Sequence, residues 1–150
     1  MTQRRLISNR SAPSATVVPI LVYADVNNAI EWLCGAFGFV ERLRVEHDGV
    51  VWHAQLIVAQ GAIMLGRKGG EYQPPRRGEV PAYVHVSVED VDLHHENAKT
   101  YGATIVAAPS NKPFGERQYT VEDPEGHRWT FSQHVEDVEP SKWGATTRTM

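Results

Sequence analysis

One spacing occurs twice in this sequence, and that repeat constrains the fold more than any other feature. Asp25-Val26 and Asp90-Val91 each stand where an apolar strand pattern gives way to a helical one. Gly61 follows Asp25 by 36 residues, and Gly126 follows Asp90 by the same 36. Because the two halves share little sequence identity, this spacing is the main evidence for an internal duplication of a β-α-β-β-β unit.

A single unit of this kind cannot bury a face of its sheet without a second layer. We therefore predict an α+β fold in which two tandem βαβββ units form paired curved mixed sheets, with the helices outside and a central cleft. Concave sites of this kind are where proteins bind small molecules.

Local patterns assign the elements within each unit. The first unit has a strand in VVPILVYADV, a helix in NNAIEWLCGAFGF that ends at Gly38, and three strands divided at Asp48-Gly49 and Gly61. The second has a strand in YVHVSVEDV, a helix in VDLHHENAKTYG, and strands in ATIVAAPSNKPFG, ERQYTVED and HRWTFSQH. Asp123-Pro124-Glu125-Gly126 has the residue choices of a type I turn.

Composition sets the limits of the domain. Residues 1–15 are polar and aperiodic, which predicts a flexible N-terminal tail, and 135–150 form a C-terminal tail whose Trp143 either packs onto the body or is mobile. We predict one domain over 16–134, made of units 16–68 and 82–134. The Gly- and Pro-rich linker 69–81 between them should form no regular element.

Charge and apolar content exclude several classes of function. A formal net charge of −3 provides no basic field for phosphates, so we expect no nucleic-acid partner and a neutral or cationic ligand. No apolar run is long enough to span a membrane, and the N-terminus lacks the apolar stretch of a secretory signal. We therefore expect a cytoplasmic protein without membrane contact. Cys34, the single cysteine, lies in an apolar pattern and is expected to pack in the core.

The repeat with VEDPEGHRWTF near its end resembles the vicinal-oxygen-chelate superfamily of glyoxalases, bleomycin-resistance proteins and dioxygenases. The resemblance covers about residues 16–134. The segments AFGF, DGVVWHAQL, GERQYTVEDPEGHRW and FSQHVEDVEPSKW are similar more narrowly to its glyoxalase-like branch. The resemblance implies the paired-sheet fold, but this superfamily includes isomerases, dioxygenases, thiol transferases and drug-sequestering proteins. Fold alone does not select among them.

The resemblance also implies where a metal would be held. Metalloenzymes of the superfamily place a His or Gln near the start of the first strand of each unit and a Glu in the last strand. Those positions fall here on Val18 and Tyr83, seven residues before the two aspartates, and on Met64 and Thr130, between residues that face the helices. None of these four side chains suits a catalytic divalent ion, so we expect no metal and no cofactor. Val18 depends on the register of its strand.

Histidines elsewhere offer no clear ligand set. His94 and His95 are adjacent on the second helix, point about 100° apart, and are expected to be solvent-exposed. His53 and His85 lie on strands where they would line the cleft, although a structural role is as well supported for each.

The candidate ligand-binding residues combine aromatic or soft walls with orienting polar groups. They are Trp52, His53, Gln55, Met64, Tyr83, His85, Arg117, Tyr119 and Thr130, with Phe114 as a further candidate wall. An enzyme could instead use Tyr83 and His85 as acid and base and hold an oxyanion with Arg117 and Tyr119. No catalytic residue is assigned.

The sequence favours a metal-independent small-molecule-binding protein that sequesters an aromatic or antibiotic-like ligand. The alternative is a glyoxalase-like lyase or dioxygenase with a displaced metal site. A third hypothesis is an interaction subunit with a vestigial cleft. Because proteins of this superfamily commonly pair, we also expect a homodimer, with units exchanged between chains or not.

Overall fold

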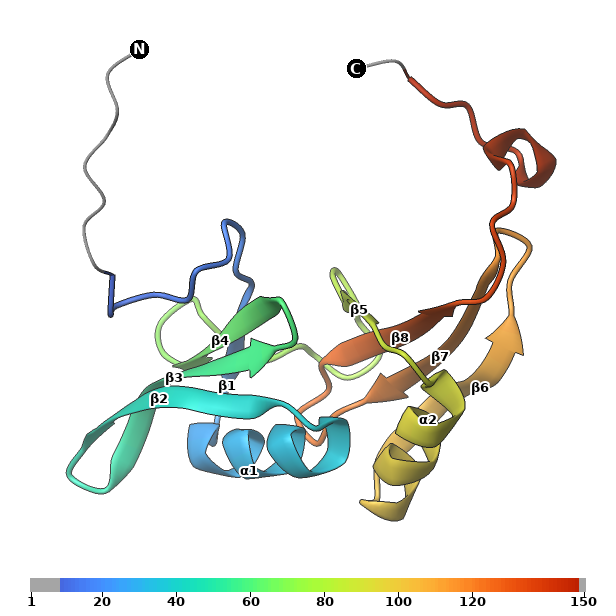
Figure 1. Ribbon diagram of the computed structural model, residues 1–150. Helices are drawn as coiled ribbons and strands as arrows, with labels where there is room; N and C mark the ends of the chain where they lie inside the picture. Colours follow the sequence, from blue (N-terminus) through green and yellow to red (C-terminus); the bar gives the residue numbers. More distant parts are fainter. Residues whose placement is uncertain (1–8, 149–150) are drawn as a thin grey trace, which may run out of the picture. The chain divides into compact units, whose positions relative to one another are not determined.

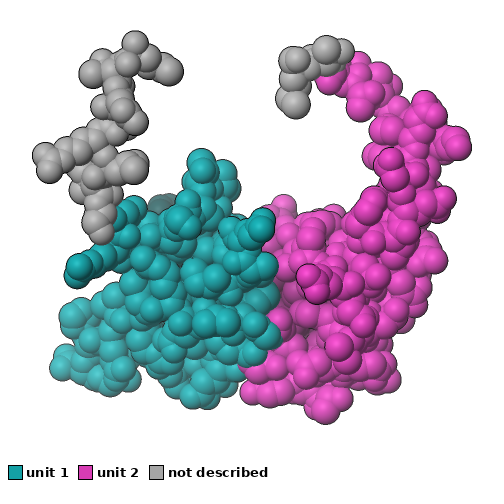
Figure 2. Space-filling model, in the orientation of Figure 1, with its two compact units in different colours: residues 1–34, 38–73 teal, residues 35–37, 74–150 magenta. Residues whose placement is uncertain are grey.

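The computed structural model describes residues 9–148 and divides into two compact units. Unit 1 consists of Met1–Cys34 and Gly38–Gln73, and unit 2 of Gly35–Phe37 and Pro74–Met150 (Figure 2). Each unit contains one four-stranded mixed sheet. In the described part of the chain no helix is both long and apolar enough to cross a membrane.

Unit 1 has the predicted order of elements. These are β1 (Ile20–Tyr23), α1 (Val26–Phe37), β2 (Val40–His47), β3 (Val50–Val58) and β4 (Gly61–Arg67). The sheet order is β1-β4-β3-β2, with β1 parallel to β4 and the other pairs antiparallel. Figure 1 shows α1 along one face of this sheet.

Unit 2 repeats the same topology. Its elements are β5 (Val84–Ser87), α2 (Val91–Thr100), β6 (Thr104–Asn111), β7 (Glu116–Glu122), β8 (Arg128–His134) and a final 3-10 helix, η1 (Pro140–Trp143). The sheet order is β5-β8-β7-β6, again with the outer pair β5 and β8 parallel. The matched order in the two sheets confirms the duplicated βαβββ unit.

The repeated aspartates begin both helices. Asp25 Oδ1 accepts a hydrogen bond from the backbone N–H of Asn28, and Asp90 Oδ1 accepts one from that of Leu93, each at 3.0 Å. An N-cap of this kind satisfies a backbone donor that the first helical turn leaves free. Equal spacing in the sequence therefore reflects equivalent capping in the two units.

The predicted Asp-Pro-Glu-Gly turn is also present. The N–H of Gly126 donates to the carbonyl of Asp123 at 3.0 Å. The buried Asp123 carboxylate accepts hydrogen bonds from the backbone of Glu125 and His127 and, at 3.2 Å, from the indole N–H of Trp129. This turn is thereby tied to the core, and its residues have a structural role.

Both chain ends that were predicted as tails include segments that bond to the folded part of their unit. In unit 1, Pro13 is buried and the carbonyl of Ser11 accepts a hydrogen bond from Gln55 of β3. In unit 2, the N–H groups of Val135 and Glu136 donate to the carbonyl of Gly115. Residues 1–8 and 149–150 of the two predicted tails lie outside the described residues.

Candidate functional site

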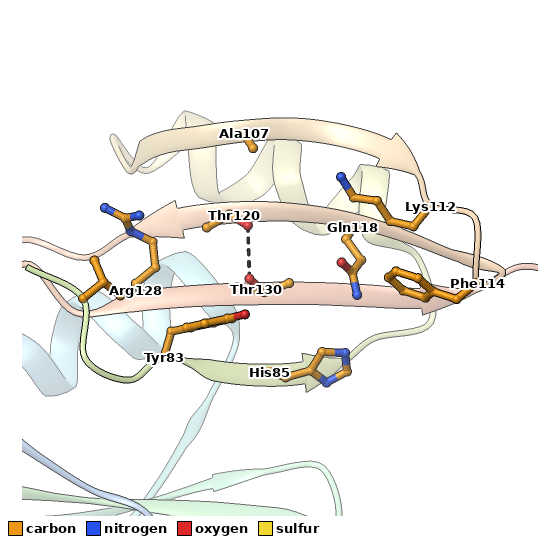
Figure 3. A pocket seen from close by; sticks show the side chains of 10 residues that line it. Tyr83, His85, Ala107, Lys112, Phe114, Gln118, Thr120, Arg128 and Thr130 are labelled. Carbon is orange, nitrogen blue, oxygen red and sulfur yellow. Dashed lines mark hydrogen bonds between the residues drawn. The ribbon is translucent and has the colours of Figure 1, made fainter. Parts of the chain in front are cut away.

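A hollow of about 720 Å³ lies on the face of the unit 2 sheet that does not carry the core (Figure 3). Trp129, Phe131, Tyr119 and Val121 point to the other face and are buried, and α2 lies against β6, β7 and β8. Because side chains alternate along a strand, the residues between them line the hollow. Its lining consists of Val80, Tyr83, His85, Ala107, Lys112, Phe114, Gln118, Thr120, Arg128 and Thr130.

Polar side chains of β7 and β8 are linked in cross-strand pairs along this face. Thr120 Oγ1 and Thr130 Oγ1 are 3.1 Å apart in the middle of the hollow (Figure 3). Gln118 Nε2 donates to Ser132 Oγ at 3.1 Å, and Arg128 Nη2 donates to Glu122 Oε2 at 3.1 Å. These bonds fix the orientation of the lining side chains, so the polar face is preorganised.

Glu116 continues the network at one end of the same face. Its carboxylate accepts a hydrogen bond from Ser132 Oγ at 2.8 Å and contacts His134 Nδ1 at 2.6 Å. Burial by itself would raise the pKa of Glu116, but the bonds from His134 and Ser132 and the nearby His85 lower it to below 4.5 overall. Glu116 is therefore ionised at neutral pH.

Three of the predicted site residues meet in this hollow. His85 comes from β5, Tyr83 directly precedes that strand, and Thr130 lies beside His85 in the register of β5 and β8. Tyr83 is 63% exposed, so its ring is accessible from the solvent. The candidate wall residue Phe114 also lines the hollow, where it packs against Trp143 of η1 with ring centroids 5.7 Å apart.

Arg117 and Tyr119, which were predicted for the site, lie on the opposite face of β7. Arg117 is held by Asp92 of α2 through Nε and Nη2 at 3.0–3.1 Å. The buried hydroxyl of Tyr119 contacts His94 Nδ1 at 2.6 Å. Both residues join the sheet to α2 and take no part in the hollow.

His94 is packed against the sheet, so the expectation that it is solvent-exposed was wrong. Its ring centroid is 4.0 Å from that of Phe131, and its Nε2 lies 3.2 Å from the carbonyl of Phe37, which can only accept. Nε2 therefore carries the proton, and Nδ1 accepts from Tyr119. Burial lowers the pKa of His94, partly offset by the bond to Phe37, and burial raises the pKa of Tyr119.

The remaining predicted site residues belong to unit 1. Trp52 shares the face of the buried Ala54 and stacks with the guanidinium of Arg67, 4.7 Å from the ring centroid. Met64 is half-buried on the other face, paired in register with Gln55. None of these residues lines the hollow of unit 2.

Gln55 is occupied by the protein itself. Its side-chain amide donates to the carbonyl of Ser11 at 2.8 Å and to His53 Nε2 at 3.1 Å, and it accepts from Arg42. With every polar atom bonded and an exposure of 1%, Gln55 anchors the N-terminal segment over this face of the unit 1 sheet. Gln55 therefore binds the chain's own backbone, and His53 contacts the Gln55 side chain.

The positions that hold metal in the superfamily carry unsuitable donors. Tyr83 and Thr130 lie in the hollow, while Met64 and Val18 are half-buried in unit 1. Across residues 9–148, no three His, Cys, Asp or Glu side chains are grouped so that they could hold a metal ion. The residue types at these four positions do not fit the usual metal of the fold.

The lining residues that were not predicted from the sequence lie on β6, β7 and β8, near the β6–β7 loop, and at Val80 before β5. Alternation in ERQYTVE could have identified two of them, because apolar Tyr119 and Val121 mark the core face and leave Gln118 and Thr120 for the other. Arg128 follows from the same rule applied to RWTF. No local pattern identifies Lys112, because its place depends on how the β6–β7 connection folds.

Comparisons with known proteins agree with this fold. The family model described as Glyoxalase/Bleomycin resistance protein/Dioxygenase superfamily matches residues 15–131. The crystal structure of TioX from Micromonospora sp. ML1 is 37% identical in sequence, with a TM-score of 0.69, and the match covers 81% of this chain and 100% of that one. An uncharacterized protein of Mycobacterium tuberculosis is 35% identical over 127 residues, which is 80% of this chain and 75% of that protein.

A more distant match shows the fold alone. The genomically encoded fosfomycin resistance protein FosX from Listeria monocytogenes has a TM-score of 0.61 at 14% identity, covering 81% of this chain and 94% of that one. Taken with the family model, these matches show that the chain belongs to the Glyoxalase/Bleomycin resistance protein/Dioxygenase superfamily.

Proposed function

We propose that this protein binds a small organic molecule in the hollow of unit 2 and holds it without a metal ion. The observation that carries the proposal is the preorganised polar face, walled by Tyr83 and Phe114, within a volume of about 720 Å³. A volume of this size accommodates a drug-sized ligand. Tyrosine and threonine at two of the superfamily's metal positions support binding through side chains alone.

Sequestration of an aromatic or antibiotic-like compound is the role we propose for this binding. Rings at the edge of the hollow suit stacking, and the Thr120–Thr130 pair and Gln118 offer hydrogen bonds along its floor. Stacking and hydrogen bonding hold a ligand without breaking or forming a covalent bond in it. A lyase or dioxygenase would need such a reaction, and a binding protein does not.

A thermal-shift screen of antibiotics and aromatic metabolites tests the proposal. A ligand at 100 times its dissociation constant should raise the free energy of unfolding by about 2.7 kcal/mol. Tyr83→Ala should weaken binding by removing an exposed wall of the hollow. Tyr72→Ala is a matched control, because Tyr72 is 64% exposed and lies outside the hollow.

Two results would contradict the proposal. Equal affinity in the Tyr83→Ala and unaltered proteins would place the ligand elsewhere. Stoichiometric uptake of zinc, nickel, manganese or iron, with turnover that depends on the metal, would favour the lyase or dioxygenase instead.

A further inference from the structure

The charged side chains that line the hollow are all basic. Lys112 and Arg128 contribute to the lining, together with His85, whereas no aspartate or glutamate does. Two glutamates lie beside the lining on the same sheet: Glu122 pairs with Arg128, and Glu116 with His134. The expectation of a neutral or cationic ligand came from the net charge, and the lining of the hollow does not support it.

Arg128 has fewer partners than its guanidinium can use. Within residues 9–148 its hydrogen-bond acceptor is Glu122, reached through Nη2 at 3.1 Å, and its Nε–H is buried without an acceptor. A guanidinium has five N–H donors arranged to bind a carboxylate through two of them. Arg128 therefore keeps donor capacity at the edge of the hollow.

Arg117, on the same strand pair, shows the contrasting case. Its Nε and Nη2 are bound by Asp92, and its Nη1 donates to Asn111 at 3.1 Å. The two arginines lie on opposite faces of the sheet, and the one that faces α2 has acceptors at all three nitrogens. The missing acceptors of Arg128 are thus specific to the side that faces the hollow.

Lys112 supplies a second positive charge at the other end of the hollow (Figure 3). Its side chain is half-buried, and in the described part of the chain no acidic side chain forms an ion pair with it. Figure 3 shows the Thr120–Thr130 pair and the Tyr83 ring between Lys112 and Arg128. Aromatic walls with a cation at each end match an unsaturated ring that carries acidic groups.

We propose that the hollow of unit 2 selects organic anions, specifically aromatic carboxylates, which are attracted by the positive charges of Arg128 and Lys112. The inference rests on the proposed function, since it names the class of ligand for the same site. It differs from that proposal in requiring a negative charge on the ligand.

Three probes that share a naphthalene ring system, one negatively charged, one neutral and one positively charged, test this selection. 2-Naphthoate, 2-naphthamide and 2-naphthylmethylammonium are titrated into the full chain and followed by NMR, including the side-chain Nε–H signal of Arg128. We expect naphthoate to bind on the order of tenfold more tightly than the amide, with weakening as salt is added. The ammonium probe should bind most weakly, and the Arg128 signal should shift with naphthoate.

Three variants assign the effect to the hollow. Arg128→Gln and Lys112→Gln should each reduce the preference for naphthoate over the amide severalfold, whereas Arg117→Gln should leave it unchanged. Lys112→Gln keeps the Arg128–Glu122 pair, so it still tests the inference if Arg128→Gln fails to fold.

The outcomes separate this inference from the proposed function. If the amide or the ammonium probe binds as well as naphthoate in the hollow, the charge selection is wrong and the binding function stands. If naphthoate fails to bind at millimolar concentration, or binds equally to Lys112→Gln and the unaltered protein, the inference also fails. Failure of every probe and of the whole compound screen would overturn both.

Discussion

His94 shows how one residue links a helix to the core of unit 2. Its imidazole lies between the carbonyl of Phe37 and the hydroxyl of Tyr119, and its ring packs on Phe131. This arrangement uses the neutral imidazole, with one nitrogen donating and the other accepting. Burial lowers the pKa of His94 below its ordinary value of 6.5.

The lowered pKa predicts that the fold loses stability on mild acidification. Below pH 6.5 the unfolded chain protonates at His94 before the folded protein does, so the unfolded state binds more protons. The free energy of unfolding should therefore be fully retained above pH 6.5 and should fall as the pH drops through the folded-state pKa. Urea denaturation at a series of pH values measures this dependence.

Replacement of the histidine isolates its share of the pH dependence. His94→Gln should have a smaller loss of unfolding free energy between neutral and mildly acidic pH than the unaltered protein. His47→Gln, at an exposed position of a hairpin, controls for the removal of a histidine. An identical pH dependence in His94→Gln and the unaltered protein would show that His94 does not titrate differently on folding.

At the scale of elements, the loop between β6 and β7 receives the C-terminal segment at Gly115. A Cβ atom at this position would lie 1.9 Å from the carbonyl oxygen of Glu136, and the backbone has a φ of +89°. Only glycine meets both conditions. Close approach of the two backbones thus depends on the absence of a side chain.

Gly115→Ala should release the C-terminal segment and destabilise unit 2. The left-handed backbone costs about 1–2 kcal/mol for alanine, and the overlap with Glu136 adds to this cost. Gly78→Ala has a similar φ of +83° with no atom within 4 Å, so it measures the backbone cost alone. Hydrogen exchange at Val135 and Glu136 should accelerate in Gly115→Ala only. Equal losses of stability in the two variants would contradict the predicted overlap.

Elements were more predictable from the sequence than the site. Capping aspartates, the Asp48-Gly49 hairpin and the turn at Gly126 are local signals, and each strand and α-helix lies where its pattern predicts, whereas η1 was not predicted. The direction of a side chain follows from the alternation along its strand. This rule predicted that Thr130 points away from the helix-facing side, and the same rule would have placed Tyr119 on the buried face. The hydrogen bond of Gln55 to Ser11 could not have been predicted, because the segment that contains Ser11 is distant in the sequence and has no regular structure.

At the scale of the whole molecule, we propose that two copies of this chain associate in solution. Several apolar side chains of the strands are exposed, including Ile20 and Val40 at 63% each. Sedimentation equilibrium at micromolar concentration should give a mass twice that of one 16.8 kDa chain. A mass equal to one chain would contradict this association. Ile20→Lys should dissociate the dimer if β1 forms the interface. Leu93→Lys, at a residue of α2 that is 67% exposed, is the control and should leave the dimer intact.

The range of the family model is shorter than the range of residues that pack together in this protein. The family model matches residues 15–131. Ser11, before that range, accepts a hydrogen bond from Gln55, and after it Glu136 bonds to Gly115 and Trp143 packs on Phe114. In each unit, a segment outside the range of the family model thus contacts the folded part of the chain. A gene fragment cut at residues 15 and 131 would lack both flanking segments and the last three residues of β8, so we expect it to fold less stably than the full chain.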